Sequence, residues 1–200
     1  MTNATQNPNK LSFPYGNQDG KGVTFMKKKI EDYVRTIPDF PEPGIMFRDV
    51  TSVIQDPDGL KLAIDSIQKL LKDVDFDIIV GAESRGFIFG APIAYNLHKS
   101  FVLARKKGKL PCETISETYS LEYGTATVEM HKDAIKPGDK VVIIDDLIAT
   151  GGTIEAIAKM VERLGGTVVK IGFLMELEGL QGRKKLARYD VASVIKYPGK

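Results

Sequence analysis

The sequence predicts an α/β fold in which helices flank a mainly parallel central sheet. Short apolar runs such as Asp77–Val80 and Lys140–Ile144 are typical of parallel strands that are buried on both faces. These runs alternate along the chain with segments whose apolar residues show the spacing of amphipathic helices. Alternating strands and helices favour a parallel sheet, whose ligands bind beyond the carboxyl ends of the strands.

The expected elements can be placed along the chain. Helical spacing predicts helices over Met26–Ile37, Asp58–Leu71, Gly86–Leu97 and Ile154–Leu164. Apolar runs predict further strands at Ser100–Ala104, Val168–Met175 and Val191–Ile195. Thr125–His131 alternates between apolar and polar residues, which predicts a half-buried antiparallel strand. Pro38 is expected to end the first helix, and Asp58 to cap the second.

The length and composition favour one folded domain. The chain has 200 residues, of which 42% are hydrophobic, and this is enough for a single core. Residues 1–25 are rich in Asn, Gln, Gly and Lys and have no sustained apolar period. We expect residues 1–25 to form a disordered extension and residues 26–200 to form a single domain.

Charge and cysteine content argue against several classes of function. The 28 Lys and Arg residues nearly balance the 26 Asp and Glu residues, so the net charge of +2 gives no case for binding nucleic acid or a membrane. No apolar run approaches the roughly 20 residues of a membrane span. The single cysteine, Cys112, fits a reducing compartment, and we expect a cytoplasmic protein. With only 2 histidines, a His-rich metal site is not expected.

The most informative stretch runs from Val141 to Thr153, where a buried strand leads into two acids, a short loop and a helix. Gly151 and Gly152 let backbone N–H groups turn toward an anion, and the helix that begins near Thr153 adds its positive end. The hydroxyls of Thr150 and Thr153 can donate to phosphate oxygens. The loop is therefore predicted to bind a phosphate group.

The two acids, Asp145 and Asp146, would repel a phosphate lying directly on them. They are expected to face hydroxyl groups a short distance along the same ligand, as in the diol of a ribose 5-phosphate. Carboxylates placed there can also stabilise a cation that develops at C1 of the ribose. Taken alone, an acid pair with a Gly-Gly turn is equally compatible with a solvated strand end.

Two further segments can bind a second anion. Gly81–Phe87 follows a predicted strand and opens a helix, so its amides and the Arg85 guanidinium can bind a diphosphate. It is not a Walker A loop, because Phe87 and Ile88 stand where Lys and Ser or Thr are required. Arg105–Pro111 is a basic cluster, which suits a diphosphate but also a solvated loop or a nucleic-acid patch.

Two segments without regular periodicity complete the list of candidates. Cys112–Tyr123 has no clear period, and a loop of this length in a compact domain is often a lid over an active site. Pro41–Gly44 is a rigid turn in an apolar setting. From composition alone, Glu122 is an exposed loop acid.

These segments, in this order along the chain, resemble the adenine-specific branch of the type I phosphoribosyltransferases. The resemblance covers residues 37–186 and includes the motif Ser120–Gly124, although the N-terminal extension is longer than is usual in that branch. It implies the type I phosphoribosyltransferase fold, with a small base-binding hood around Asp39–Asp49 and a flexible lid.

The resemblance also implies a role for individual residues. Asp145 and Asp146 would bind ribose hydroxyls, while the 5′-phosphate would be held by Ala149, Thr150, Gly151, Gly152 and Thr153. The diphosphate would be bound by Glu83, Ser84, Arg85, Arg105, Lys106 and Lys109, with a cis peptide between Glu83 and Ser84. Glu122 would handle the proton on the imidazole side of the purine, and Tyr123 would shield the reacting centre. Backbone at Met46 would read the adenine edge, and Arg48 would contact the ring.

The activity implied is the reaction of adenine with 5-phosphoribosyl-1-diphosphate (PRPP) to give AMP and diphosphate, a step of purine salvage. Mg²⁺ is expected to be held through substrate and water, with no direct protein ligand, because it keeps its waters and binds substrate phosphates. A homodimer is implied by the resemblance. The alternatives are a 6-oxopurine phosphoribosyltransferase, a non-catalytic regulator that senses PRPP, and, disfavoured by net charge, an RNA-binding module.

Overall fold

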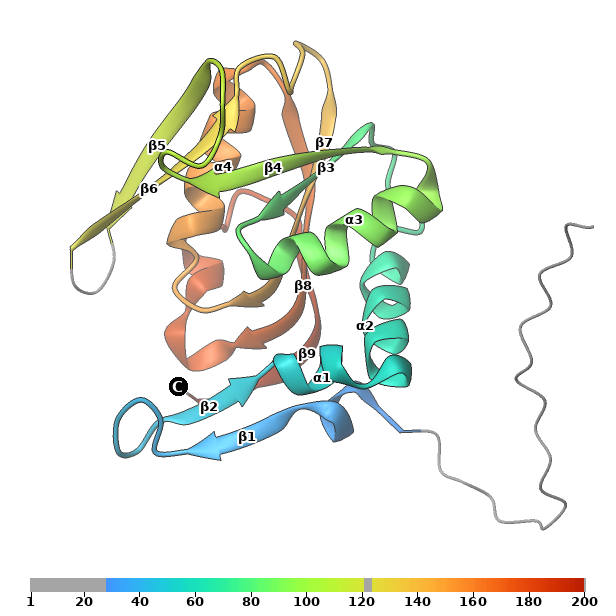
Figure 1. Cartoon of the computed structure of the whole chain (residues 1–200), viewed down its shortest axis with the longest axis vertical. Coiled ribbons are helices and arrows are strands. Elements are labelled where there is room, and N and C mark those ends of the chain that lie inside the picture. The colour runs from blue at the N-terminus through green and yellow to red at the C-terminus, as the bar shows by residue number, and fades with distance from the viewer. Residues whose placement is uncertain (1–27, 121–123, 200) are drawn as a thin grey trace, which may run out of the picture.

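The structure is a computed structural model that describes residues 28–120 and 124–199. Its centre is a seven-stranded sheet with the strand order β5–β6–β4–β3–β7–β8–β9 (Figure 1). The strands are β3 (Ile78–Ala82), β4 (Ser100–Lys106), β5 (Thr114–Ser120), β6 (Thr125–His131), β7 (Lys140–Ile148), β8 (Thr167–Leu177) and β9 (Val191–Tyr197). The five strands from β4 to β9 in this order are parallel, whereas β6 and β5 join β4 in antiparallel fashion. The predicted α/β fold with a mainly parallel sheet is confirmed.

Helices cover both faces of the parallel part of the sheet. On one face, α2 (Pro57–Lys69) and α3 (Arg85–Leu97) pack over a cluster that includes Val142 and Ile144 of β7. On the other face, α4 (Gly152–Arg163) packs over a cluster that includes Val141 and Ile143. Successive residues of β7 are thus buried in opposite directions, and this explains why the strand reads as a continuous apolar run.

The N-terminal segment differs from the prediction. The helix expected over Met26–Ile37 is wrong for the residues described: a 3-10 turn, η1 (Ile30–Tyr33), leads into β1 (Arg35–Pro38). β1 pairs antiparallel with β2 (Met46–Asp49), which is followed by α1 (Thr51–Gln55). The pairing with β2 and the 2.6 Å ion pair between Arg35 and Asp49 stabilise the extended chain, and neither is visible in local periodicity. We call the hairpin of β1 and β2, residues 35–49, the hood.

Two further corrections concern the residue that caps α2 and the segment Cys112–Tyr123. Asp56, not Asp58, caps α2, because its carboxylate accepts hydrogen bonds from the backbone N–H groups of Asp58 and Gly59. The segment interpreted as a loop without a period contains β5, which pairs with β6 along its whole length. The other predicted helices and strands are confirmed, with small shifts at their ends. Among the described residues, no helix is long and apolar enough to cross a membrane.

Candidate active site

The ends of the neighbouring strands β3 and β7 meet at one edge of the sheet and form a cavity of about 370 Å³. This is the carboxyl edge, where ligands of parallel sheets bind. The cavity is lined by Glu83, Ser84, Arg85, Lys106, Tyr119, Val128, Asp145, Asp146, Leu147, Ala149 and Thr153. The structure therefore brings together the acid pair, part of the predicted diphosphate site and part of the loop Ala149–Thr153, which is predicted to bind a phosphate and is called the phosphate loop below.

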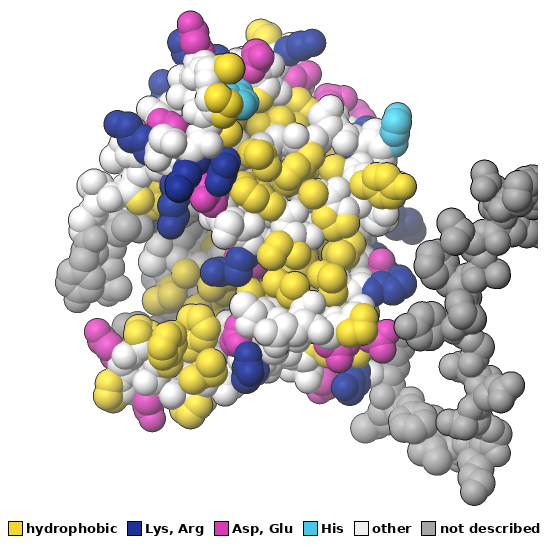
Figure 2. All heavy atoms as spheres, viewed as in Figure 1, with side chains coloured by type: hydrophobic (Ala, Val, Ile, Leu, Met, Phe, Trp, Pro, Cys, Tyr) yellow, Lys and Arg dark blue, Asp and Glu magenta, His cyan; other side chains and the backbone are white. Residues whose placement is uncertain are grey.

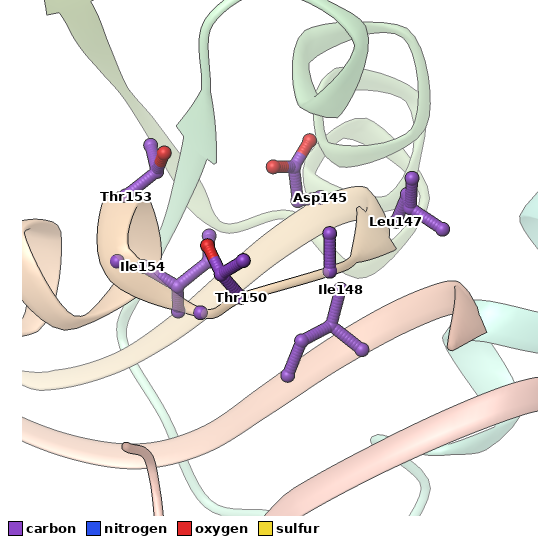
Figure 3. Close-up of a pocket in the computed structure, with 9 residues that line it drawn as sticks. Asp145, Leu147, Ile148, Thr150, Thr153 and Ile154 are labelled. Atoms are coloured by element: carbon purple, nitrogen blue, oxygen red, sulfur yellow. The ribbon is translucent and has the colours of Figure 1, made fainter. Parts of the chain in front are cut away.

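The phosphate loop connects β7 to α4 and encloses a smaller hollow of about 90 Å³. Gly151 precedes the helix with a left-handed φ of 78°, which turns the chain into the first helical turn. Figure 3 shows the side-chain oxygens of Asp145, Thr150 and Thr153 on one side of this loop, while Ile148 points to the other side. The predicted geometry of two hydroxyls and a helix N-terminus beside a carboxylate is present.

The two acids of the pair have different surroundings. Asp146 is buried, with 3% of its surface exposed, and its carboxylate accepts a hydrogen bond from Nε of Arg85. Burial and the neighbouring charge of Asp146 raise the pKa of Asp145 well above its ordinary value. The Arg85 guanidinium, about half exposed, thus offsets one negative charge of the pair.

The loop after β3 has the backbone that the resemblance implied. The peptide bond between Glu83 and Ser84 is cis, and α3 begins at the next residue, Arg85. Ser84 lies immediately before that helix and lines the cavity. The junction between β3 and α3 therefore borders the cavity.

Glu83 stabilises the basic loop. Its carboxylate accepts a 2.6 Å hydrogen bond from the backbone N–H of Lys106 and bonds of 3.3 and 3.5 Å from Arg105. Burial opposes ionisation, but these donors lower the pKa of Glu83 below its ordinary value. A carboxylate in this state repels a diphosphate, so we interpret Glu83 as the group that fixes the basic residues. Lys106 lines the cavity, whereas the structure places Lys109 at a turn where its carbonyl accepts from Arg105.

Tyr119 of β5 was not predicted as a site residue. Its ring lines the main cavity, and its hydroxyl accepts a 2.9 Å hydrogen bond from Oγ1 of Thr153. A signal for it exists in the sequence: Ile115, Glu117 and Tyr119 alternate with Ser116, Thr118 and Ser120. This period of two was obscured by the polar residues on both faces of the strand.

The hood carries the residues predicted to bind the base. Hydrophobic side chains gather on the hood at the lower left of Figure 2, and Phe40, Met46 and Phe47 are exposed there by 49%, 42% and 39%. The guanidinium of Arg48 donates to the hydroxyl of Thr36 and lies 4.2 Å from the centre of the Tyr197 ring. Met46 and Arg48 do not line the main cavity.

Two predictions, the catalytic residues and the absence of a direct metal ligand, are not tested by these contacts. Glu122 and Tyr123, the predicted catalytic residues, lie outside the described residues. Over residues 28–120 and 124–199, no group of three or more His, Cys, Asp or Glu side chains could hold a metal ion.

Comparison with known proteins agrees with this geometry. Residues 50–196 match the family described as "Phosphoribosyl transferase domain", and the chain belongs to this family. The adenine phosphoribosyltransferase of Lachnoclostridium phytofermentans is 74% identical over 173 residues, which are 86% of this chain and 99% of the relative. The structure of the Thermoanaerobacter pseudethanolicus adenine phosphoribosyltransferase is 54% identical with a TM-score of 0.81, covering 84% of this chain and 98% of that one. The Saccharomyces cerevisiae enzyme, solved with adenine and an iminoaltritol bisphosphate, is 39% identical with a TM-score of 0.77, covering 82% and 96%.

Proposed function

We infer that the protein acts in purine salvage by transferring the 5-phosphoribosyl group of PRPP to adenine, which forms AMP and diphosphate. The 74% identity to a named adenine phosphoribosyltransferase supports the substrate pair. The observation that carries the chemistry is the main cavity, in which an acid pair lies between a phosphate loop and a set of cations.

The charges in this cavity suit the two ends of PRPP. The 5′-phosphate fits the start of α4, where backbone N–H groups and the hydroxyls of Thr150 and Thr153 can donate to it. The diphosphate fits the other end, where Arg85 and Lys106 line the cavity. The ribose between them then lies beside Asp145 and Asp146.

This placement supplies the main contributions to catalysis. Cations at the diphosphate stabilise the negative charge that the leaving group gains as its bond to C1 breaks. The negative charge of the acid pair near the ribose stabilises the positive charge that develops on the ring. Holding the ribose in the cavity and adenine on the neighbouring hood lowers the entropic barrier of bringing the two reactants together.

The base and its proton are assigned to the hood and the lid. Met46 through its backbone and Arg48 through its guanidinium are proposed to hold adenine, because donors and acceptors of the backbone can distinguish a 6-amino from a 6-oxo purine. Glu122 is proposed to take the imidazole proton, and Tyr123 to keep water from the reactive ribosyl centre.

We also propose that the protein uses Mg²⁺, forms a homodimer and is located in the cytoplasm. Mg²⁺ keeps its waters and prefers substrate phosphates, so we propose that it is held by the diphosphate, the ribose hydroxyls and water, with no direct protein ligand. When bound, the ion neutralises diphosphate charge. The Arg85 guanidinium, paired with Asp146, already offsets part of the negative charge of the acid pair.

The test is a turnover assay in which adenine, hypoxanthine and guanine are offered separately with PRPP, with and without Mg²⁺. The proposal predicts AMP formation from adenine that depends on Mg²⁺. Faster turnover of hypoxanthine or guanine would identify a 6-oxopurine enzyme. Binding of PRPP without turnover of any purine would identify a regulator.

A further inference from the structure

A turn that follows β8 packs directly behind the phosphate loop. This turn, η3 (Gly182–Lys184), follows Gln181 and includes the buried Gly182. A Cβ atom on Gly182 would lie 2.8 Å from Cγ1 of Ile148 and 3.1 Å from the backbone nitrogen of Gly151. A Cβ atom on Gly151 would in turn lie 2.7 Å from the carbonyl oxygen of Gly182. The two glycines are thus in backbone-to-backbone contact, and the position of one limits the position of the other.

The next residue, Arg183, fixes this turn to the sheet. Its Nε lies 2.7 and 2.8 Å from the two carboxylate oxygens of Glu176, and its Nη1 donates to the carbonyl of Val191 at 2.7 Å. Ser193 donates to the same carboxylate at 2.8 Å and accepts from Nη2 of Arg183 at 3.3 Å. One guanidinium therefore connects the turn to both β8 and β9.

The carboxylate at the centre of this network lies beside the start of the phosphate loop. Glu176 is 5% exposed, and in the sheet it pairs with Ile148, the residue that precedes Ala149. Burial opposes its ionisation, but the donors from Arg183 and Ser193 lower its pKa overall. An ion pair that includes a buried carboxylate contributes little net stability compared with apolar side chains, whereas its geometry is well defined. Its position next to the loop points to a role in shaping the loop.

We propose that Arg183 is a positioning residue for the 5′-phosphate site: by holding Gly182 against Gly151, it sets the loop conformation that binds the phosphate of PRPP and AMP. This inference rests on the proposed function for the identity of the ligands. Arg183 itself is not proposed to contact the substrate. The effect passes through the backbone of Gly182.

The test compares ligands that use the loop with one that does not. AMP and PRPP both place a phosphate in the loop, whereas diphosphate binds at the opposite end of the cavity. Arg183→Lys keeps the charge but loses the planar set of donors, and Gly182→Ala perturbs the contact directly. The matched control is Arg188→Lys. Arg188 lies in the same segment of the chain, but it pairs at 2.6 Å with Glu162, which lies near the end of α4 that is far from the phosphate loop. Calorimetric titration measures the affinity of each variant for the three ligands, and circular dichroism shows whether each variant is folded.

We expect both test variants to bind AMP and PRPP about tenfold or more weakly, since small displacements of positioning groups have effects of this order. Diphosphate binding should stay within about twofold, and the control should match the wild type for every ligand. Unchanged AMP affinity in folded Arg183→Lys would overturn the inference, as would an equal loss of diphosphate affinity. If AMP binding is weakened in Arg183→Lys as expected but the wild type does not turn over adenine, the proposed function fails and the positioning role stands. If the wild type does not bind AMP, both fail.

Discussion

Replacing Gly151 by alanine adds one methyl group at the residue where the phosphate loop turns into α4. Gly151 has φ of 78°, a left-handed conformation that destabilises a residue with a Cβ atom by about 1–2 kcal/mol. The added Cβ atom would also lie 2.7 Å from the backbone oxygen of Gly182, which is too close for any side chain. Because both partners in this contact are backbone, the loop itself must move.

The magnitude of the effect on catalysis follows from this strain. If about 1.4 to 2.8 kcal/mol of strain is relieved only by leaving the binding-competent conformation, the KM for PRPP rises about 10- to 100-fold. The KM for adenine should change little, because the base is assigned to the hood. Steady-state kinetics with each substrate varied at saturation of the other measures both constants.

The control for this experiment is Gly138→Ala. Gly138 has φ of 94°, so it carries similar backbone strain, but an added Cβ atom there meets nothing within 4 Å. It should lower the free energy of unfolding by about 1–2 kcal/mol and leave both KM values unchanged. Equal kinetic constants for Gly151→Ala and Gly138→Ala would refute the assignment of the loop to the phosphate.

Three more predictions follow from the site. Because the folded state raises the pKa of Asp145, it binds more protons than the unfolded state between the ordinary and the raised pKa, and stability falls as pH rises through this range. Asp145→Asn should therefore raise the melting temperature at pH 8, with a smaller difference at lower pH, while impairing PRPP use; a lower melting temperature at pH 8 would contradict this. Tyr119→Phe frees the hydroxyl of Thr153 and should leave PRPP affinity equal or slightly higher, measured by titration, whereas a clear loss would show that the tyrosine hydroxyl binds the ligand. Tyr197→Leu removes the ring beneath Arg48 and should raise the KM for adenine about 2- to 20-fold with Tyr197→Phe near wild type, and a matching rise in the KM for PRPP would argue for general misfolding.

Sequence reasoning found the parts of the site that are encoded by residues next to one another. The acid pair, the loop from Ala149 to Thr153 and the turn at Gly81–Phe87 each follow the end of a predicted strand, and the structure brings them to one cavity. Local sequence could place these segments because backbone amides, glycine and a helix start that follow a strand are a local pattern suited to phosphate.

Features that depend on distant partners were missed or misinterpreted. The segment Met26–Ile37 has helical spacing of apolar residues, but the end of this segment lies in β1, whose conformation is determined by pairing with β2. Glu83 is predicted to lie in the diphosphate site and lines the cavity, and only the fold shows that its carboxylate accepts hydrogen bonds from Arg105 and Lys106. The contact of Gly182 with Gly151 joins two segments whose proximity no local pattern reveals.

The central claim is that one cavity holds a ribose between the acid pair and the phosphate loop. A crystal structure of the protein with AMP tests it most directly. We predict the 5′-phosphate within hydrogen-bond distance of the backbone N–H groups of residues 150–153, and the ribose hydroxyls on the carboxylates of Asp145 and Asp146. A phosphate bound elsewhere, with those carboxylates and the N-terminus of α4 not in contact with the nucleotide, would contradict the account.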